Sequence, residues 1–468
     1  MKLKGTMVIE LTDVDTGDVE TYTEENMVTN AVNNILGANP LGLFYNVTSG
    51  SNTMLDWNDY LLPICPNMIG GILLFSNTLD EDVDNIYPQS DNLPVAYASN
   101  DVNGTTDLAR GSLNQTESKA LDNGYKFVWE FTASQGNGTI AAAALTGSLG
   151  GQFAYGNDIG DTTAYLQVNQ MAMDADFSDQ QVLFETVSID FDNEVLYSFD
   201  WSDSSVVIKK ARIPITSIGL VELLNDTTIT LIDETVITPS TFKFTTSYYS
   251  YGAFMDGQDG YWYGFANGSG NSSGSASMTW IKISKTDYSY TEGSWTLSNA
   301  TLKSVGYRYL ASNYMYFYQY ACVRDGYLYV MAYDAAGIYK INISNSADVT
   351  LIDLGFTSAW KAVGETGSAA GVYMLRVQDL IIGYDFILTA NDTVIATVGS
   401  TKFGLLCTQM FQYKNFLIGW GCAIGTNYRQ AYLLTPYMAT INNLDSSVVK
   451  DSSKTMKITY TLTEADSE

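Results

Sequence analysis

The chain has 468 residues, of which 46% are hydrophobic, and this is enough apolar material for a sizeable core. Only 16% are charged, and 51 acidic against 23 basic residues give a formal net charge of −28. Binding to phosphate groups needs clustered Lys and Arg, so this balance excludes nucleic acid and anionic membrane surfaces from the expected partners. The chain contains no histidine, which excludes His-dependent catalytic triads and the usual His-bearing zinc sites.

The start of the sequence, MKLKGTMVIELTDVD, lacks the apolar segment and cleavage site of a signal peptide. No apolar run approaches the roughly 20 residues that a membrane span needs. We therefore expect synthesis in the cytoplasm, no membrane partner, and release by a route such as lysis if the protein acts outside a cell. The four cysteines form no CxxC pair and are expected to be buried thiols. A cross-strand disulfide between Cys407 and Cys422 is the alternative, although their spacing alone does not support it.

The first predicted element is an amphipathic hairpin. Apolar and polar side chains alternate along residues 3–14, and DTGD at residues 15–18 forms the turn. The segment NMVTNAVNNILG (residues 26–37) then has apolar residues at helical spacing. It predicts the one clear helix of the chain, which Asn26 caps and Gly37 ends.

Strand signals follow further along this N-terminal region. GGILLFS (residues 70–76) predicts a short buried strand, and the acidic residues of the loop at 80–84 are expected to be solvated rather than to bind a metal. Residues 124–147 predict two strands joined by a QGNG turn. One face of the first strand carries four aromatic residues: Tyr125, Phe127, Trp129 and Phe131. The small alanines of the second strand allow close approach of another sheet or another subunit.

Several of these segments together resemble a known group of proteins. They are KGTMVIELTDVDTGDVETYTEENMVTNA, GGILLFSNTLDEDVDNIYP, FVWEFTASQGNGTIAAAALT and, at the other end of the chain, SSKTMKITYTLTE. As a combined pattern they resemble the attachment segments of tail fibre or receptor-binding proteins in phages of gut Firmicutes and Bacteroidetes, over residues 1–155 and 450–468. The resemblance implies a virion structural protein of the tail that is made in the host cytoplasm, contacts other tail proteins, and forms homo-oligomers, commonly trimers. It carries no catalytic motif.

The middle of the chain repeats one strand-turn pattern. Five phrases share it: NEVLYSFDW (193–201), DGYWYGF (259–265), DGYLYVMAY (325–333), VQDLIIGYD (377–385) and YKNFLIGWG (413–421). A further strand follows four of them: SVVIKKARI, MTWIKISK, GIYKINIS and QAYLLTP. The first three phrases start 66 residues apart, whereas the last two intervals between successive phrases are only about 53 and 36 residues. The repeat therefore predicts an array of similar β units with irregular connections.

Four-stranded blades that recur at roughly 40–50 residues are typical of a β-propeller. We expect each phrase to supply the middle hairpin of one blade, and the region suits about five to seven blades. The predicted fold is mainly β, with a β-propeller-like central domain and a small α+β N-terminal attachment domain. The sequence has no WD series and no kelch double-glycine pattern, so a β-sandwich or a trimeric β-prism remains the alternative.

Apolar and polar residues alternate in the same way at both ends of the chain, in KLKGTMVIELTD at the start and in KTMKITYTLTE at the end. Domain termini often lie close together, so these two strands are expected to share one sheet. The predicted organisation is an attachment domain at residues 1–155, a propeller-like domain at 156–445, and a C-terminal strand at 446–468 that returns to the attachment domain.

Aromatic residues give the only candidate binding site. The chain has 33 tyrosines, which are densest in SYYSYGAF (247–254) and YRYLASNYMYFYQY (307–320). Exposed aromatic rings stack on sugars, and we single out four candidate glycan-binding residues: Tyr251, Trp262, Tyr314 and Tyr318. The competing interpretation is that each of these rings fills an interface between blades.

Glycoside hydrolysis needs two carboxylates on either side of the bond. Four acidic residues lie in aromatic surroundings: Asp256, Asp259, Asp325 and Asp334. Asp259 and Asp325 each precede glycine, which is ordinary turn chemistry, and the chain lacks a sialidase-type Asp box. We therefore expect no catalytic residues, no metal and no cofactor. The predicted function is that of a non-enzymatic tail protein that contacts a host surface glycan or protein. The alternatives are a polysaccharide depolymerase and a head-decoration or collar component.

Overall fold

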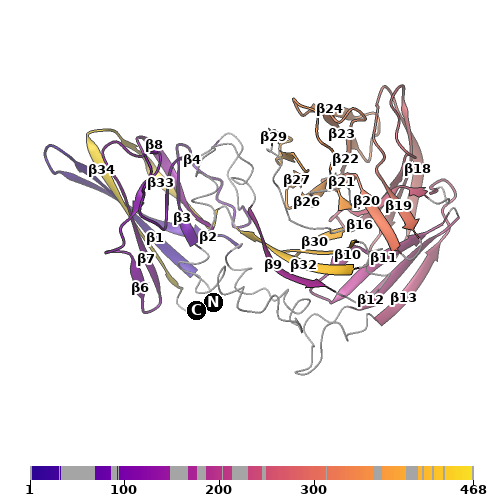
Figure 1. The fold of residues 1–468 in the computed structure, drawn as a ribbon, viewed down its shortest axis with the longest axis horizontal. Helices are drawn as coiled ribbons and strands as arrows, with labels where there is room; N and C mark the ends of the chain where they lie inside the picture. Colours follow the sequence, from indigo (N-terminus) through magenta and orange to yellow (C-terminus); the bar gives the residue numbers. More distant parts are fainter. Residues whose placement is uncertain are drawn as a thin grey trace. The chain divides into compact units, whose positions relative to one another are not determined.

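β-strands make up nearly all the regular structure of the chain in a computed structural model (Figure 1). It describes residues 3–30, 32, 69–85, 92, 94–147, 167–175, 186–202, 204–212, 230–244, 249–311, 314–361, 371–396, 409–413, 416–423, 426–435 and 438–465. The chain divides into two units. The terminal unit comprises residues 1–38, 53–169 and 433–468, and the propeller unit comprises residues 39–52 and 170–432.

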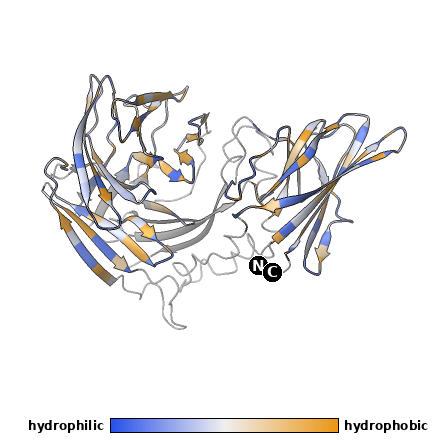
Figure 2. Cartoon of the chain, turned by 180° about the vertical axis from the view of Figure 1, so that it is seen from behind, coloured by the Kyte–Doolittle hydropathy of each residue, from blue (hydrophilic) through white to orange (hydrophobic). Residues whose placement is uncertain are grey.

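One ten-stranded sheet forms the terminal unit. Its order is β4-β3-β8-β33-β2-β1-β34-β7-β5, with β6 paired to β7. The strands are β1 (Leu3–Asp13), β2 (Val19–Val28), β3 (Ile69–Phe75), β4 (Pro94–Ser99), β5 (Ser112–Leu113), β6 (Lys119–Leu121), β7 (Gly124–Phe131), β8 (Gly138–Gly147), β33 (Thr440–Lys450) and β34 (Lys454–Glu464). Figure 2 shows hydrophobic and hydrophilic residues interleaved along these strands.

The two ends of the chain lie side by side in the middle of this sheet. β34 pairs antiparallel with β1 from Leu3 opposite Glu464 to Asp13 opposite Lys454, and its other edge pairs with β7. Alternation along each strand places Ile9 of β1, Ile458 of β34 and Trp129 of β7 in one cross-strand row, and all three are fully buried. The alternating sequence of the two ends therefore builds the centre of one core.

The two edges of the ten-stranded sheet approach each other. Tyr97 of β4 forms a parallel bridge with Arg110, which lies two residues before the start of β5. Trp129 of β7 donates a hydrogen bond from its Nε1 to the carbonyl of Ser99 at 3.1 Å. The sheet is thus nearly closed into a barrel-like shape, which leaves little unpaired edge.

The expectation of a helix at residues 26–37 is wrong at its start, since β2 continues through Val28. Asn26 lies within β2, opposite Gly5 of β1, and its side chain contacts the hydroxyl of the buried Tyr460. Asn30 and Val32, which the structure describes, are helical, and most of the remaining predicted helix lies outside the described residues. The pairing of β2 with β1 and β33 thus overrides the helical spacing of the sequence only as far as Val28.

The boundary before the C-terminal segment lies earlier than the sequence suggests, because β33 already belongs to the terminal unit. β33 pairs with β2 and with β8, and its register against β8 shifts between Asn443 and Val448. Such an irregularity breaks the period of two that marks a strand in a sequence. The structure divides the chain at residues 169/170 and 432/433, where the sequence predicts 155/156 and 445/446.

Lys450 is a buried cation of the terminal unit. Only 1% of it is exposed, and its Nζ donates to the carbonyl of Thr132 at 2.9 Å and to Asn137 Oδ1 at 2.7 Å. Burial lowers the pKa of Lys450 to about 8, against a smaller opposite effect of Asp451. A neutral set of oxygen acceptors thus holds this ammonium group in place of a carboxylate.

We expect the terminal unit to gain stability as the pH rises from about 8 towards 9.5. The folded chain releases the Lys450 proton near pH 8, whereas the unfolded chain keeps it until about 10.5. The unfolded state therefore binds more protons in this window, so the free energy of unfolding increases with pH. Urea denaturation of the wild type and of Lys450→Met at several pH values measures the effect. An equal slope in both proteins would contradict it.

The propeller unit consists of six four-stranded sheets among its described residues: β10-β11-β12-β13, β15-β16-β17-β18, β21-β22-β23-β24, β26-β27-β28-β29, β30-β31-β32-β9 and β14-β19-β20-β25. The first two are β10 (Thr186–Asp190), β11 (Val195–Trp201), β12 (Val206–Arg212), β13 (Thr230–Ile237), and β15 (Ala253–Asp256), β16 (Tyr261–Ala266), β17 (Ala276–Ser284), β18 (Tyr290–Leu297). The next two are β21 (Ala321–Arg324), β22 (Tyr327–Met331), β23 (Gly337–Asn342), β24 (Val349–Asp353), and β26 (Leu375–Val377), β27 (Leu380–Ile382), β28 (Phe386–Leu388), β29 (Val394–Ala396). The last two are β30 (Gln409–Tyr413), β31 (Phe416–Ala423), β32 (Thr426–Thr435), β9 (Gln167–Ala175), and β14 (Tyr249–Tyr251), β19 (Gly306–Ala311), β20 (Tyr314–Gln319), β25 (Gly371–Val372).

Five of these sheets form a ring of blades. Their first strands, β10, β15, β21, β26 and β30, all contribute residues to one cavity. Consecutive first strands contact each other from β10 to β26, and β30 contacts β10 again. The last blade takes its fourth strand, β9, from residues that precede all the other blades in the sequence. Hydrogen bonds between early and late parts of the unit thus close the ring, and the prediction of a propeller-like fold is confirmed.

Each of the five repeated phrases supplies the second strand of a blade. The first turn of four blades contains a non-glycine residue with a positive φ: Glu194, Gln258, Asp325 and Gln378. At Asp325–Gly326 this is a two-residue hairpin with φ of 52° and 79°, because Arg324 pairs directly with Tyr327. Turns of this type match the twist of the strands that they join, which explains the Asp-Gly pair at this position.

The sixth sheet explains why the phrases are irregularly spaced. Its strands come from the connections between blades: β14 precedes β15, β19 and β20 precede β21, and β25 precedes β26. No such strand separates β29 from β30 among the described residues, and there the phrases lie closest together. We call β14-β19-β20-β25 the cap sheet. In the part of the chain that the structure describes, no helix is long and apolar enough to cross a membrane.

Candidate functional site

The cap sheet carries a row of tyrosines across its strands. Tyr251 of β14 is the cross-strand partner of Tyr307 in β19, which in turn pairs with Tyr318 in β20. Partners directly opposite each other project from the same face of a sheet, so their rings meet. The ring centroids of Tyr307 and Tyr318 are 4.3 Å apart with an interplanar angle of 16°, and those of Tyr251 and Tyr307 are 5.8 Å apart.

Three more rings extend this row beyond β20. Tyr320 lies 6.1 Å from Tyr318 and meets Tyr373 edge-on at 4.5 Å. Trp360 lies 5.3 Å from Tyr320 and 5.1 Å from Tyr373. We call Tyr251, Tyr307, Tyr318, Tyr320, Tyr373 and Trp360 the aromatic ladder. All six side chains are half-buried, so the ladder is packed within itself and still presents ring surface to solvent.

Trp360 has an unusual backbone conformation. Its φ is 50°, which is rare for a bulky residue and costs free energy. The surrounding turn is fixed by the carboxylate of Asp385, which accepts hydrogen bonds from the Ser358 hydroxyl and the Ala359 amide, both at 2.6 Å. The chain therefore holds Trp360 at the end of the ladder against its conformational preference.

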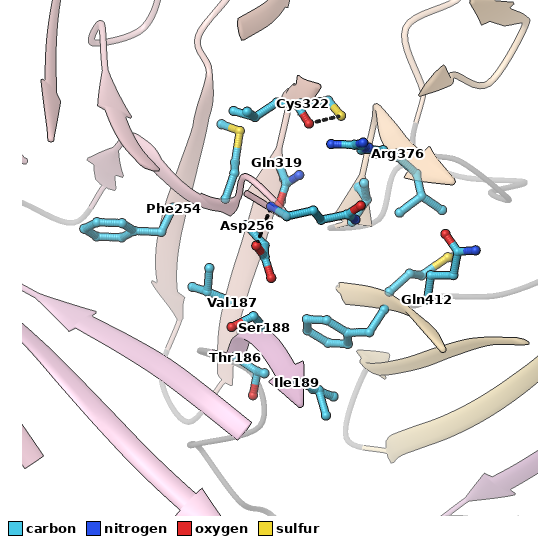
Figure 3. Close-up of a pocket in the computed structure, with 17 residues that line it drawn as sticks. Thr186, Val187, Ser188, Ile189, Phe254, Asp256, Gln319, Cys322, Arg376 and Gln412 are labelled. Carbon is cyan, nitrogen blue, oxygen red and sulfur yellow. Dashed lines mark hydrogen bonds between the residues drawn. The ribbon is translucent and has the colours of Figure 1, made fainter. Parts of the chain in front are cut away.

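The opposite face of the cap sheet borders the cavity along the propeller axis (Figure 3). Gln319 and Val372 line this cavity, while their chain neighbours Tyr318 and Tyr373 belong to the ladder. Successive residues of a strand point to opposite faces, so the ladder lies on the outer face of the cap sheet. The cavity has a volume of about 130 Å³. Its remaining lining comes from Thr186, Val187, Ser188, Ile189, Phe254, Met255, Asp256, Gln258, Cys322, Val323, Leu375, Arg376, Met410, Phe411 and Gln412.

The polar groups of the cavity bond mostly within their own blade, and Arg376 also reaches the neighbouring blade. Arg376 donates from Nε to the carbonyl of Gln378 at 3.0 Å and from Nη2 to Asp325 Oδ1 at 3.2 Å. Asp256 accepts from Lys285 Nζ and from the Gln258 amide, both through Oδ1. Burial raises the pKa of the Cys322 thiol to about 12, so this thiol is not a nucleophile at neutral pH.

The four predicted glycan-binding residues have different positions. Tyr251 and Tyr318 belong to the aromatic ladder. The side chain of Tyr314 lies outside the described part of the structure. Trp262 is wholly buried and donates a hydrogen bond to Ser188 Oγ at 2.7 Å, so it has no ring surface for a sugar. Its position between blades agrees with the competing interpretation that these rings fill interfaces.

Four ladder residues were not among the predicted site residues: Tyr307, Tyr320, Tyr373 and Trp360. The first two lie in the densest tyrosine stretch of the sequence, and the alternation around β20 would have placed Tyr318 and Tyr320 on one face. Trp360 and Tyr373 lie 40 residues or more from that stretch, and only the tertiary structure brings them to it.

Hydrogen bonds or ion pairs within the protein use all four candidate carboxylates. Asp259 accepts from the Tyr261 amide at 3.1 Å and from the Tyr263 hydroxyl at 2.7 Å. Asp334 accepts from the Ala336 amide at 3.1 Å, and Asp325 forms the ion pair with Arg376. Asp256 alone lines the cavity. Among the described residues, no three acidic or cysteine side chains form a group that fits a metal ion.

Comparisons with known proteins leave the family open. No protein-family model matches the chain, and no curated protein matches it. Among solved structures, a structural-genomics protein of unknown function from Bacteroides thetaiotaomicron has 9% identity and a TM-score of 0.27, over 77% of this chain and 90% of that one. The AfRom2 CNH domain has 9% identity and a TM-score of 0.22, over 68% of this chain and 93% of its own. These likenesses are too distant to carry an argument about function.

Proposed function

We propose that this chain is a non-enzymatic glycan-binding protein and that the aromatic ladder is its contact surface. The observation that carries this proposal is the row of six half-buried aromatic side chains on the outer face of the cap sheet. Tyr and Trp combine an apolar ring with a polar hydrogen-bonding group, which suits them to surfaces that bind partly apolar, hydroxylated ligands. The strain at Trp360 supports a functional role, because such strain is common at binding sites.

The setting that we propose is the tail of a phage virion. The support is the resemblance of residues 1–155 and 450–468 to attachment segments of phage tail proteins. In this setting the terminal unit attaches the chain to other tail proteins, and the propeller unit carries the ladder that binds a host surface glycan. A head or collar position is the alternative, and antibody labelling of virions in negative-stain electron micrographs separates the two.

Retention on immobilised host polysaccharide tests the glycan-binding proposal. We expect Tyr307→Ala and Trp360→Ala each to weaken binding by roughly thirtyfold, the factor for a side chain worth about 2 kcal/mol at an interface. Tyr261→Ala is the matched control, because Tyr261 is 37% exposed but lies on β16, outside the ladder. Near-ultraviolet circular dichroism checks that each variant is folded. Equal loss in all three variants, or in none, would contradict the assignment.

The depolymerase alternative is tested on the same material. We expect retention of the chain without any increase in reducing ends or unsaturated products. The appearance of either product would overturn the non-enzymatic part of the proposal.

A further inference from the structure

Two lysines flank Trp360 at one end of the aromatic ladder. The Nζ of Lys303 lies 5.5 Å from the ring centroid of Trp360 and 5.5 Å from that of Tyr333, which is 45% exposed. Lys361 follows Trp360 in the chain, and its Nζ lies 5.3 Å from the ring centroid of Tyr384. Both ammonium groups are therefore within cation–π distance of aromatic rings.

The position of Lys303 is unfavourable for a cation in the unliganded protein. Burial lowers the pKa of Lys303, and the Asp334 carboxylate opposes this effect only in part. The ion pairs among the described residues of the propeller unit involve other cations, such as Lys285 and Arg376. Neither Lys303 nor Lys361 forms one there, although the chain has more than twice as many acidic as basic residues.

The backbone at this end of the ladder is fixed before any ligand binds. The Asp385 carboxylate holds the turn at residues 358–360, and this turn places Trp360 in its strained conformation with Lys361 directly after it. A preformed turn loses little conformational entropy on binding, so its contacts contribute more fully to affinity. Trp360 thus belongs to an ordered turn, and Lys361 follows this turn directly in the chain.

We propose that the ligand of the ladder is an anionic glycan, with Lys303 and Lys361 contacting its carboxylate or phosphate groups. This inference rests on the proposed glycan-binding function and adds the charge of the ligand to it. An anionic group beside Lys303 compensates for the lost hydration of the ammonium, whereas a neutral sugar leaves it unpaired. The aromatic rings contact the apolar faces or edges of the sugars, and the lysines select for charge.

Matched polysaccharides test the ligand's charge. The full chain is applied to immobilised bacterial surface polysaccharides, both neutral and acidic, and the retained ones are then modified. Carboxyl reduction converts uronic acids into neutral sugars, and hydrolytic removal of phosphate tests the other source of charge. We expect one of these two treatments to weaken retention of an acidic polysaccharide by about tenfold or more.

Variants locate the charge recognition. We expect Lys303→Gln with Lys361→Gln to lower affinity for the acidic polysaccharide by about tenfold and to abolish the effect of removing its charge. Lys303→Arg with Lys361→Arg is expected to restore most of the binding. Lys282→Gln is the matched control, since Lys282 lies 3.8 Å above the ring of Tyr261, outside the ladder.

Each outcome decides between the two proposals. Retention of neutral and acidic polysaccharides alike, with no effect of the lysine variants, would overturn the anionic ligand and leave glycan binding intact. Retention of none of the polysaccharides would overturn glycan binding itself, and the inference with it. Loss of binding in the ladder variants but not in the lysine variants would likewise count against charge recognition.

Discussion

Replacing Asp392 by asparagine is expected to lower the free energy of unfolding of the propeller unit by about 3 kcal/mol, the lower end for breaking a buried ion pair. Asp392 joins two blades through Arg324, which is 1% exposed and whose Nη2 lies 2.5 Å from Asp392 Oδ1. Arg324 also donates to the Tyr329 hydroxyl at 3.1 Å and to the Thr389 carbonyl at 3.0 Å, and Lys340 shares the same carboxylate. Without the carboxylate, a buried guanidinium group keeps its charge with no anion beside it.

Asp325→Asn is the matched control for this variant. Both aspartates have a positive φ, 61° at Asp392 and 52° at Asp325, and asparagine tolerates this conformation equally well. Both also pair with an arginine, but the side chain of Asp325 is 66% exposed. An exposed pair contributes about 0–1 kcal/mol. Urea denaturation followed by tryptophan fluorescence measures both variants, and similar losses of stability would contradict the role of burial.

Trp262→Ala is expected to destabilise the propeller unit by about 3–5 kcal/mol, the usual cost of truncating a buried tryptophan. Trp262 of β16 packs against Tyr197 at 4.8 Å and edge-on against Phe199 at 5.2 Å, both from the preceding blade. Its Nε1 also bonds to Ser188 of β10. The substitution therefore opens a cavity between two blades and leaves a buried hydroxyl without its donor.

Tyr261→Ala provides the comparison on the opposite face of the same strand. Tyr261 is 37% exposed, so its truncation is expected to cost less than about 1 kcal/mol. Thermal denaturation of the three proteins measures the difference. A Trp262→Ala protein as stable as the Tyr261→Ala protein would show that the interface between these blades does not depend on the buried ring.

The sequence predicts the blades better than it predicts their connections. A strand of two or three large apolar residues after a polar turn is a local signal, and all five phrases that contain it are second strands of blades. The cap sheet has no such signal. β14 and β25 are only three and two residues long, and they form because the cap sheet pairs segments that lie far apart in the sequence. For the same reason the spacing of the phrases does not reveal the ring of five blades.

The candidate site is visible in the sequence only in part. The tyrosine-rich stretch identifies Tyr318, because its neighbours alternate along one strand. The sequence alone does not show that Trp262 is buried in the core while Trp360 belongs to the half-buried ladder. The difference depends on the positive φ at Trp360 and on Asp385, a residue 25 positions away, and neither has a local sequence signature.

The most direct test of the ladder as the ligand surface is fluorine NMR of the chain labelled with 5-fluorotryptophan. The chain has eight tryptophans, and the resonance of Trp360 is assigned with Trp360→Phe and that of Trp262 with Trp262→Phe. On titration with a retained polysaccharide fragment, the account predicts that the Trp360 resonance shifts in proportion to occupancy while that of Trp262 stays in place. Saturable binding that leaves Trp360 unshifted and moves other tryptophans would contradict it.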